Sequence, residues 1–151
     1  MKPLVCEALS TTRPSTAERV LMWIPIVGWT ISHAMENARF KPIIREIEDQ
    51  LLARPDTSDF WTSRNGSSEF TRLIRAILAK ELDWPNDHFL PEDPMKILLW
   101  AHRDGLDGVF AIQAIEKEIG IRIPVEKFES FSSGGTLGEF VDCLSSLTNA
   151  E

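Results

Sequence analysis

The chain has 151 residues, 43% of them apolar, which is enough for one ordinary hydrophobic core or for a small domain with a separate appendage. Its formal net charge of −7 is unevenly distributed: residues 1–66 hold 8 Lys and Arg against 8 Asp and Glu, whereas residues 67–151 hold 8 against 15. An acidic second part repels nucleic-acid phosphates and suits basic protein surfaces, so the composition argues against nucleic-acid binding. Cys6 and Cys143 lie near opposite ends without a CxxC motif, which indicates a reduced, cytoplasmic chain.

The N-terminal residues lack the apolar stretch that a signal peptide needs, and we interpret them as a loosely docked terminus. Ser15 and Glu18 fit a capping box, in which each side chain bonds a free amide at a helix start. A helix is therefore predicted to begin near Thr16.

This helix runs into an apolar stretch, residues 21–31 (LMWIPIVGWTI), where Pro25 and Gly28 are expected to bend or end it. The stretch is shorter than the roughly 20 residues that a membrane-spanning helix needs. Three uses stay open: a helical hairpin packed on its own domain, an interfacial anchor, or a surface buried against a second copy. The flanking charges show no positive excess, which argues against membrane contact. The candidate residues for self-association are Trp23, Ile24, Ile26, Val27 and Trp29.

Pro42 fits the first turn of the next helix, which Pro55 ends. The apolar face of this helix is predicted to comprise Ile43, Ile44, Ile47, Leu51 and Leu52. Residues 54–68 (RPDTSDFWTSRNGSS) have the composition of a connection, so we place a boundary here between an N-terminal helical extension, residues 1–66, and a second domain, residues 67–151. Within it, Phe60 and Trp61 are expected to hold the connection against a neighbouring surface.

The second part opens with a helix of about four turns whose apolar stripe comprises Phe70, Leu73, Ile74, Ile77, Leu78 and Leu82. A proline-rich connection, residues 83–96, then leads to a short apolar segment, residues 97–100, that should cover one end of a helical bundle. The connection contains residue types that bind metals, but their spacing is not fixed, so we expect them to face solvent and predict no metal site. These residues are Asp87, His88, Glu92 and Asp93.

Residues 104–124 (DGLDGVFAIQAIEKEIGIRIP) predict one complete helix with both ends marked. Asp104 is a good N-cap, Asp107 suits the first turn, and Gly120 ends the helix. The residues three and four apart that should form its packing face are Leu106, Val109, Phe110, Ile112, Ile115 and Ile119.

The end of the chain predicts a helical turn at residues 125–131, a turn at residues 132–135, and a last helix capped by Thr136 and Glu139. The buried face of this last helix should comprise Leu137, Phe140, Val141 and Leu144.

Residues 68–147 resemble the acyl carrier protein family, through DGLDG, the following VFAIQAIEKEIGIRIP, and SFSSGGTLGEFVDCL. The resemblance implies an all-α fold: a carrier-like four-helix bundle, here with an N-terminal helical extension. In that family the serine of D-S-L bears a phosphopantetheine arm. Asp104, Leu106 and Asp107 match this motif, and Gly105 occupies the serine position. Since a phosphodiester needs a hydroxyl oxygen, the covalent cofactor is excluded at this site.

Two further departures from the family pattern surround Gly105. The family tends to show D-L-G before the motif, where this chain has WAHR at residues 100–103, and Phe110 stands where carriers commonly have an acidic residue.

We therefore expect a non-enzymatic module that acts by protein–protein recognition and uses no cofactor and no metal. Its partner would be a basic protein surface, met by negative charge and by apolar contact. The charged residues in this interpretation are Asp104, Asp107, Glu116 and Glu118, and the apolar ones are Leu106, Val109 and Phe110. Alternatively, the carboxylates form an ordinary solvated helix face. Two other functions stay open: a lipid or acyl-chain binder, and a structural protein that dimerises through its apolar N-terminal hairpin.

Overall fold

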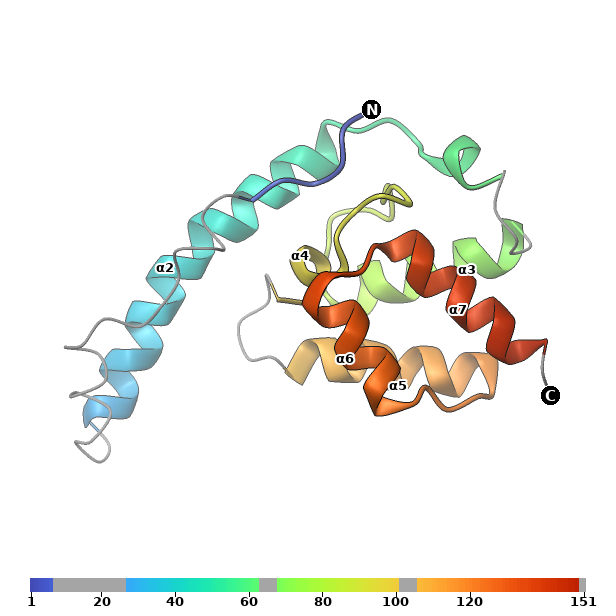
Figure 1. Ribbon diagram of the computed structural model, residues 1–151. Coiled ribbons are helices and arrows are strands. Elements are labelled where there is room, and N and C mark those ends of the chain that lie inside the picture. The colour runs from blue at the N-terminus through green and yellow to red at the C-terminus, as the bar shows by residue number, and fades with distance from the viewer. Residues whose placement is uncertain (7–26, 63–67, 101–105, 150–151) are drawn as a thin grey trace.

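The computed structural model describes residues 1–6, 27–62, 68–100 and 106–149, and the side chains of residues 27–39 are not described (Figure 1). Its elements in chain order are α2 (Val27–Leu52), η2 (Ser58–Trp61), α3 (Ser68–Glu81), α4 (Met95–Trp100), α5 (Leu106–Ile119), α6 (Val125–Gly134) and α7 (Leu137–Thr148). These described residues form no β-strand, and the predicted all-α class is confirmed.

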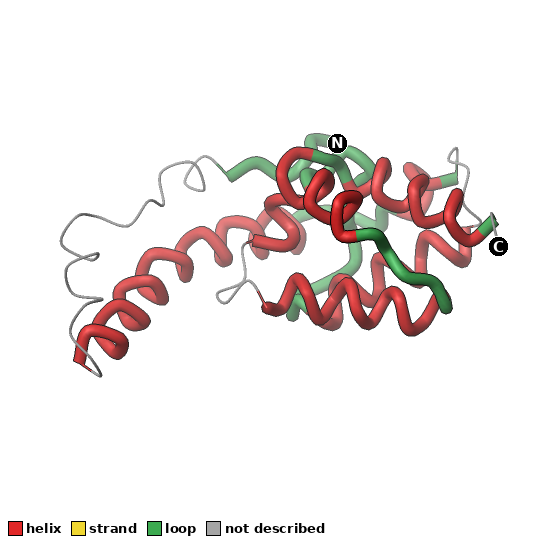
Figure 2. Tube along the Cα trace, turned by 60° about the horizontal axis from the view of Figure 1, so that its bottom comes forward, coloured by secondary structure: helices red, strands yellow, loops and turns green. Residues whose placement is uncertain are grey.

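The last five helices pack around one core, in which α3 lies against α5, and α4 contacts both α5 and α6 (Figures 1 and 2). Apolar residues three and four apart bury one stripe of α3 and of α7, as predicted. The fully or nearly fully buried residues of the bundle include Ile74 and Leu78 of α3, Leu82 just after it, Leu98 and Leu99 of α4, Ile115 of α5, and Leu137, Phe140, Val141 and Leu144 of α7.

The α2 helix corrects one prediction, because it is continuous over 26 residues and contains Pro42 in its interior. Proline has no amide hydrogen for the carbonyl of residue 38, which is why the sequence favoured a helix start at this point. The Pro42 ring lies on an exposed side of the helix, where water can replace the missing donor. Gly28, expected to bend or end a helix, lies in the first turn of α2.

The C-terminal half of α2 joins the bundle core through Ile43, Ile47 and Leu51, which are buried. Leu52 was expected on the same face, but it is exposed because it lies about 100° around the helix from Leu51. Together with Leu4 and Trp61, these residues belong to the same apolar cluster as the bundle helices. One core therefore crosses the boundary expected near residue 66, and the division into two domains stays a prediction.

The α5 helix is present as predicted and ends at Gly120, whose φ of 74° favours glycine. Its buried face is different from the predicted one. Gly108, Ala111, Ile112 and Ile115 are buried, whereas Val109 and Phe110 are exposed by 39% and 54%. The small residues bring the helix close to α4: a Cβ on Gly108 would lie 3.5 Å from the Leu99 carbonyl oxygen. Small residues, which carry little hydropathic signal, thus decide which side of α5 packs.

The connection from α6 to α7 is shorter than predicted, because α6 continues to Gly134. Gly135 follows, and a Cβ there would lie 2.6 Å from the Phe131 ring, so this position requires glycine for lack of space. Phe131 packs edge-on against Phe140, with ring centroids 5.5 Å apart. The Thr136–Glu139 capping box is confirmed, with both reciprocal hydrogen bonds present.

Some predictions lie outside the described residues. These concern the capping box at Ser15 and Glu18, the helix start near Thr16, and the positions Trp23, Pro25, Ile24, Ile26, Asp104 and Gly105. Within the described ranges, no helix is both long enough and apolar enough to cross a bilayer.

Candidate functional site

An exposed face of α5 carries most of the interaction residues predicted from the sequence. Val109 and Phe110 project from it, and Gln113 and Lys117, which follow at helical spacing, are exposed on the same side. Asp107 lies three positions before Phe110, and therefore beside it on the helix, and is half-buried; Glu118 is exposed on the same flank of the helix. The arrangement is an apolar pair with carboxylates beside it, which we call the α5 face. It comprises Asp107, Val109, Phe110, Gln113, Lys117 and Glu118.

Glu116 has a structural role in addition to its charge. Its Oε1 accepts a hydrogen bond of 2.6 Å from the backbone N–H of Ile123, and its side chain is half-buried. This contact holds the segment after α5 against the helix, with Ile121 and Ile123 buried in the core. Leu106 begins α5, but its side chain is among those not described.

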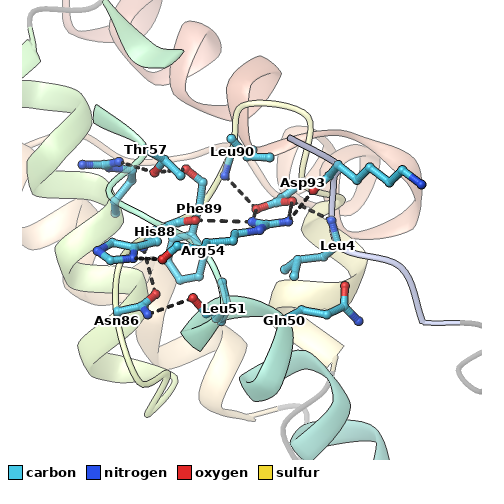
Figure 3. Close-up of polar contacts among 12 residues, drawn as sticks. Leu4, Gln50, Leu51, Arg54, Thr57, Asn86, His88, Phe89, Leu90 and Asp93 are labelled. Carbon is cyan, nitrogen blue, oxygen red and sulfur yellow. Dashed lines mark hydrogen bonds and ion pairs between the residues drawn. The ribbon is translucent and has the colours of Figure 1, made fainter. Parts of the chain in front are cut away.

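A second polar centre, which the sequence did not predict, is the buried ion pair of Arg54 and Asp93 (Figure 3). The Arg54 guanidinium donates to both carboxylate oxygens, at 2.6 Å from Nη1 to Oδ2 and 3.0 Å from Nη2 to Oδ1. Asp93 Oδ2 also accepts from the Leu90 N–H at 2.7 Å. Such a bidentate, hydrogen-bonded geometry is what allows opposite charges to be buried together.

The same pair holds the N-terminal segment. Asp93 Oδ1 accepts from the Leu4 N–H at 2.7 Å, and Arg54 Nη2 donates to the Lys2 carbonyl at 2.9 Å. Gln50, one turn before Arg54, donates to the Val5 carbonyl at 2.9 Å and accepts from the Val5 N–H at 3.2 Å. The terminus that the sequence suggested to be loosely docked is therefore fixed at residues 2–5.

The proline-rich connection is clamped to α2 and η2 by further polar contacts (Figure 3). The Leu51 carbonyl accepts from the Asn86 side chain at 3.0 Å, and His88 Nδ1 lies 2.9 Å from the Arg54 carbonyl. The Phe89 carbonyl accepts from the Thr57 hydroxyl and from the Trp61 indole.

The expectation that this connection faces solvent was therefore wrong for Asp93, which is fully buried, and for His88, which is half-buried and engaged; Glu92 is exposed as expected. No local pattern reveals such a pair, since Arg54 and Asp93 lie 39 positions apart. The one indication in the sequence was Arg54, a charged residue just beyond the end of the amphipathic helix that contains Ile47 and Leu51.

A pocket of about 330 Å³ lies between η2 and the first turns of α3. Most of the residues that line it are polar, although much of the surface they present comes from their carbon atoms: Ser58, Asp59, Trp61, Thr62, Glu69, Thr71, Arg72 and Arg75. Arg75 is buried, donates to the Thr57 hydroxyl, contacts Asp87 at 3.5 Å and lies 5.8 Å from the centroid of the Trp61 ring. The two arginines in the lining are balanced by two carboxylates, so the formal charge of the lining is zero.

Beside this pocket, the Asp56 carboxylate closes the turn into η2. Its Oδ1 accepts from the hydroxyl of Ser58 at 2.7 Å and from the backbone N–H of the same residue at 3.0 Å. These hydrogen bonds stabilise the charged form and lower the pKa of Asp56 below its ordinary value of 3.8.

The described residues contain no group of three or more His, Cys, Asp and Glu side chains placed to hold a metal ion, and both cysteines are free thiols. The described residues thus form an all-helical protein with two notable features. One is the exposed α5 face, and the other is the buried Arg54–Asp93 pair with Gln50 and the backbone groups that these side chains bond, which we call the polar clamp. Comparisons with protein-family models, curated proteins and solved structures found no match.

Proposed function

We propose that this protein is a non-enzymatic recognition module, a carrier-like helical scaffold without an attachment serine, that binds a basic protein surface through the α5 face. The observation that carries the proposal is the exposure of Val109 and Phe110, two neighbouring large apolar side chains on a helix whose opposite side is fully packed. Exposed aromatic and aliphatic residues beside charges are the usual composition of a protein contact.

The charge around this pair determines the kind of partner. Asp107 and Glu118 flank the apolar residues and Lys117 is the one cation of the α5 face. Residues 67–151 as a whole carry 15 acidic against 8 basic side chains, so a basic partner is attracted over a longer range than the contact itself. Glu116 contributes to this potential even though its carboxylate is bonded to Ile123.

The recognition proposal is tested with a photo-crosslinking residue placed at Phe110 in the full chain, and in a matched control at Phe60, which is exposed to a similar degree on η2. We expect a discrete crosslinked partner from the native cell at position 110 and not at position 60. Charge reversal at Asp107 and Glu118 should weaken the crosslink, and more so at low salt. Equal labelling from both positions would count against the α5 face.

The carrier-like part of the proposal is tested separately with a broad-specificity phosphopantetheinyl transferase and coenzyme A. The intact mass of the wild-type chain should not change, because Gly105 has no hydroxyl, whereas the Gly105→Ser variant should gain one arm. If Gly105→Ser also stays unmodified, the chain is not carrier-like at this motif, and recognition through α5 then depends on the crosslinking result alone.

Self-association is a second candidate, which the course of α2 favours. Its N-terminal half extends away from the bundle, and none of the other described elements lies beside it (Figures 1 and 2). The sequence places Val27 and Trp29 in this half. Light scattering of the full chain beside a Trp29→Glu variant would test it, and two equal monomeric masses would exclude it.

A further inference from the structure

The N-terminal segment is held in the manner of a bound peptide. It runs beside the C-terminal part of α2, and among the described residues its backbone is bonded by side chains (Figures 1 and 3). Arg54 bonds the carbonyl of Lys2, Asp93 bonds the N–H of Leu4, and Gln50 bonds both backbone groups of Val5. In recognition of non-helical peptides, main-chain hydrogen bonds of this kind provide affinity without reading the sequence.

Among residues 2–5, the side chain that the core binds is that of Leu4. Leu4 is 1% exposed and belongs to the core cluster that includes Leu51 and Phe89. Its neighbours Lys2, Pro3 and Val5 are all exposed. Leu4 is therefore the one fully buried anchor among residues 2–5, and Cys6, which is half-buried, packs against the same core beyond them.

Two of the side chains that hold the segment, Arg54 and Asp93, also have partners elsewhere in the chain. Asp93 is fixed by two hydrogen bonds from Arg54 and one from the Leu90 N–H, and Arg54 also donates to the His88 carbonyl. The Gln50 amide bonds at an exposed position, where water can replace Val5. A site whose polar groups are already oriented loses little on binding, which is the condition for a peptide to be exchangeable.

We propose that Gln50, Arg54, Asp93 and the core beneath Leu4 form a peptide-binding site that residues 2–5 occupy as a tethered ligand, and that the same site binds a separate peptide with the sequence of residues 1–6. Its ligand class is a non-helical segment with one buried leucine. A tethered segment competes at an effective concentration in the millimolar range, so a free peptide reaches the site only when the tethered one is disabled.

The test uses the full-length Leu4→Asp variant, because a carboxylate cannot occupy a position that is 1% exposed without a partner. A fluorescent peptide MKPLVS, with serine for Cys6 to prevent oxidation, is titrated in an anisotropy assay. We expect saturable binding to Leu4→Asp, at least tenfold weaker binding to the wild-type chain, and a rise in the melting temperature of the variant only.

Four controls make the result specific. A peptide with aspartate at the leucine position should not bind, and a peptide with alanine there should bind at least tenfold more weakly, from the loss of apolar burial. Adding Gln50→Ala to the Leu4→Asp variant should weaken peptide binding several-fold, whereas adding Ser133→Ala on α6 should leave peptide binding unchanged.

Several results would overturn the proposal. One is a folded Leu4→Asp chain that does not bind the peptide, and another is equal binding of the leucine and aspartate peptides. Should Leu4→Asp be unfolded by circular dichroism and not be rescued by the peptide, the Leu4→Ala variant is measured instead. If that folded variant also shows no saturable binding, residues 2–5 are an inseparable part of the core.

Discussion

At the scale of single residues, Asp93 joins separate parts of the chain through both its side chain and its backbone. Its carboxylate joins Arg54, Leu4 and Leu90, and its backbone carbonyl accepts from the N–H of Leu137 at 2.8 Å. One buried side chain thus connects the end of α2 and the N-terminal segment, and its backbone holds the start of α7.

Replacing Asp93 with alanine should destabilise the protein by about 3–5 kcal/mol, because it leaves the Arg54 guanidinium buried without its counter-ion. Urea unfolding followed by circular dichroism measures this difference. In the double variant Arg54→Met, Asp93→Leu, both charges are absent, and it should be clearly more stable than Asp93→Ala. A loss below about 1 kcal/mol for Asp93→Ala would show that the pair is open to water.

Asp56 gives a prediction about pH. Since its folded pKa is lowered from 3.8, chiefly by the Ser58 hydroxyl and then by its N–H, it adds stability above its unfolded pKa, and that contribution is lost as the pH falls through the lower folded value. Ser58→Ala should return the pKa toward 3.8 in an NMR titration and flatten the loss of stability below pH 4. Ser133→Ala, on exposed α6, should leave this titration unchanged. An unchanged Asp56 titration in Ser58→Ala would contradict the assignment.

At the scale of elements, the continuity of α2 is the feature that most changes the sequence prediction. Pro42 is tolerated at a helix start but costs about 3 kcal/mol in a helix interior. Pro42→Ala should therefore stabilise the protein, by up to about 3 kcal/mol, and raise its helical circular dichroism signal. If Pro42 instead began a helix, the substitution would be neutral or slightly destabilising, and thermal unfolding would distinguish the two outcomes.

The helices themselves were largely predictable, because α3, α5 and α7 have apolar residues at helical spacing and two of them have clear end signals. Which side of α5 would be buried was not predictable from hydropathy. Val109 and Phe110 are more apolar than Gly108 and Ala111, yet the small residues pack, since they let α5 approach Leu99 of α4. Hydropathy measures a preference for leaving water, whereas close helix packing also depends on side-chain size.

At the scale of the whole molecule, the polar clamp could not be predicted, since its members come from the N-terminus, the end of α2 and the connection after α3. Local composition correctly described residues 83–94 as a non-helical connection, whereas residues 54–62 include the short helix η2 and α4 begins at Met95, inside the second predicted connection. It gave no information about which of their charges would meet in the core, because that depends on tertiary packing.

The α5 face should be dispensable for folding. Val109→Ser with Phe110→Ser should change the free energy of unfolding by no more than about 0.5 kcal/mol, as is usual for exposed positions, while abolishing partner capture. The matched variant Val125→Ser, on α6 and 65% exposed, should affect neither quantity. A large loss of stability in the α5 variant would mean that these side chains contribute to folding and not only to recognition.

The hydrogen bond from Leu4 to Asp93 spans 89 positions of the chain. During synthesis on a ribosome, the Leu4 amide must therefore wait until 89 further residues have been made before it can reach Asp93. Contacts of such separation form late and slowly. Throughout that interval the Leu4 side chain has no core to enter and remains accessible to chaperones. Docking of residues 2–5 is therefore expected to be a late step of folding.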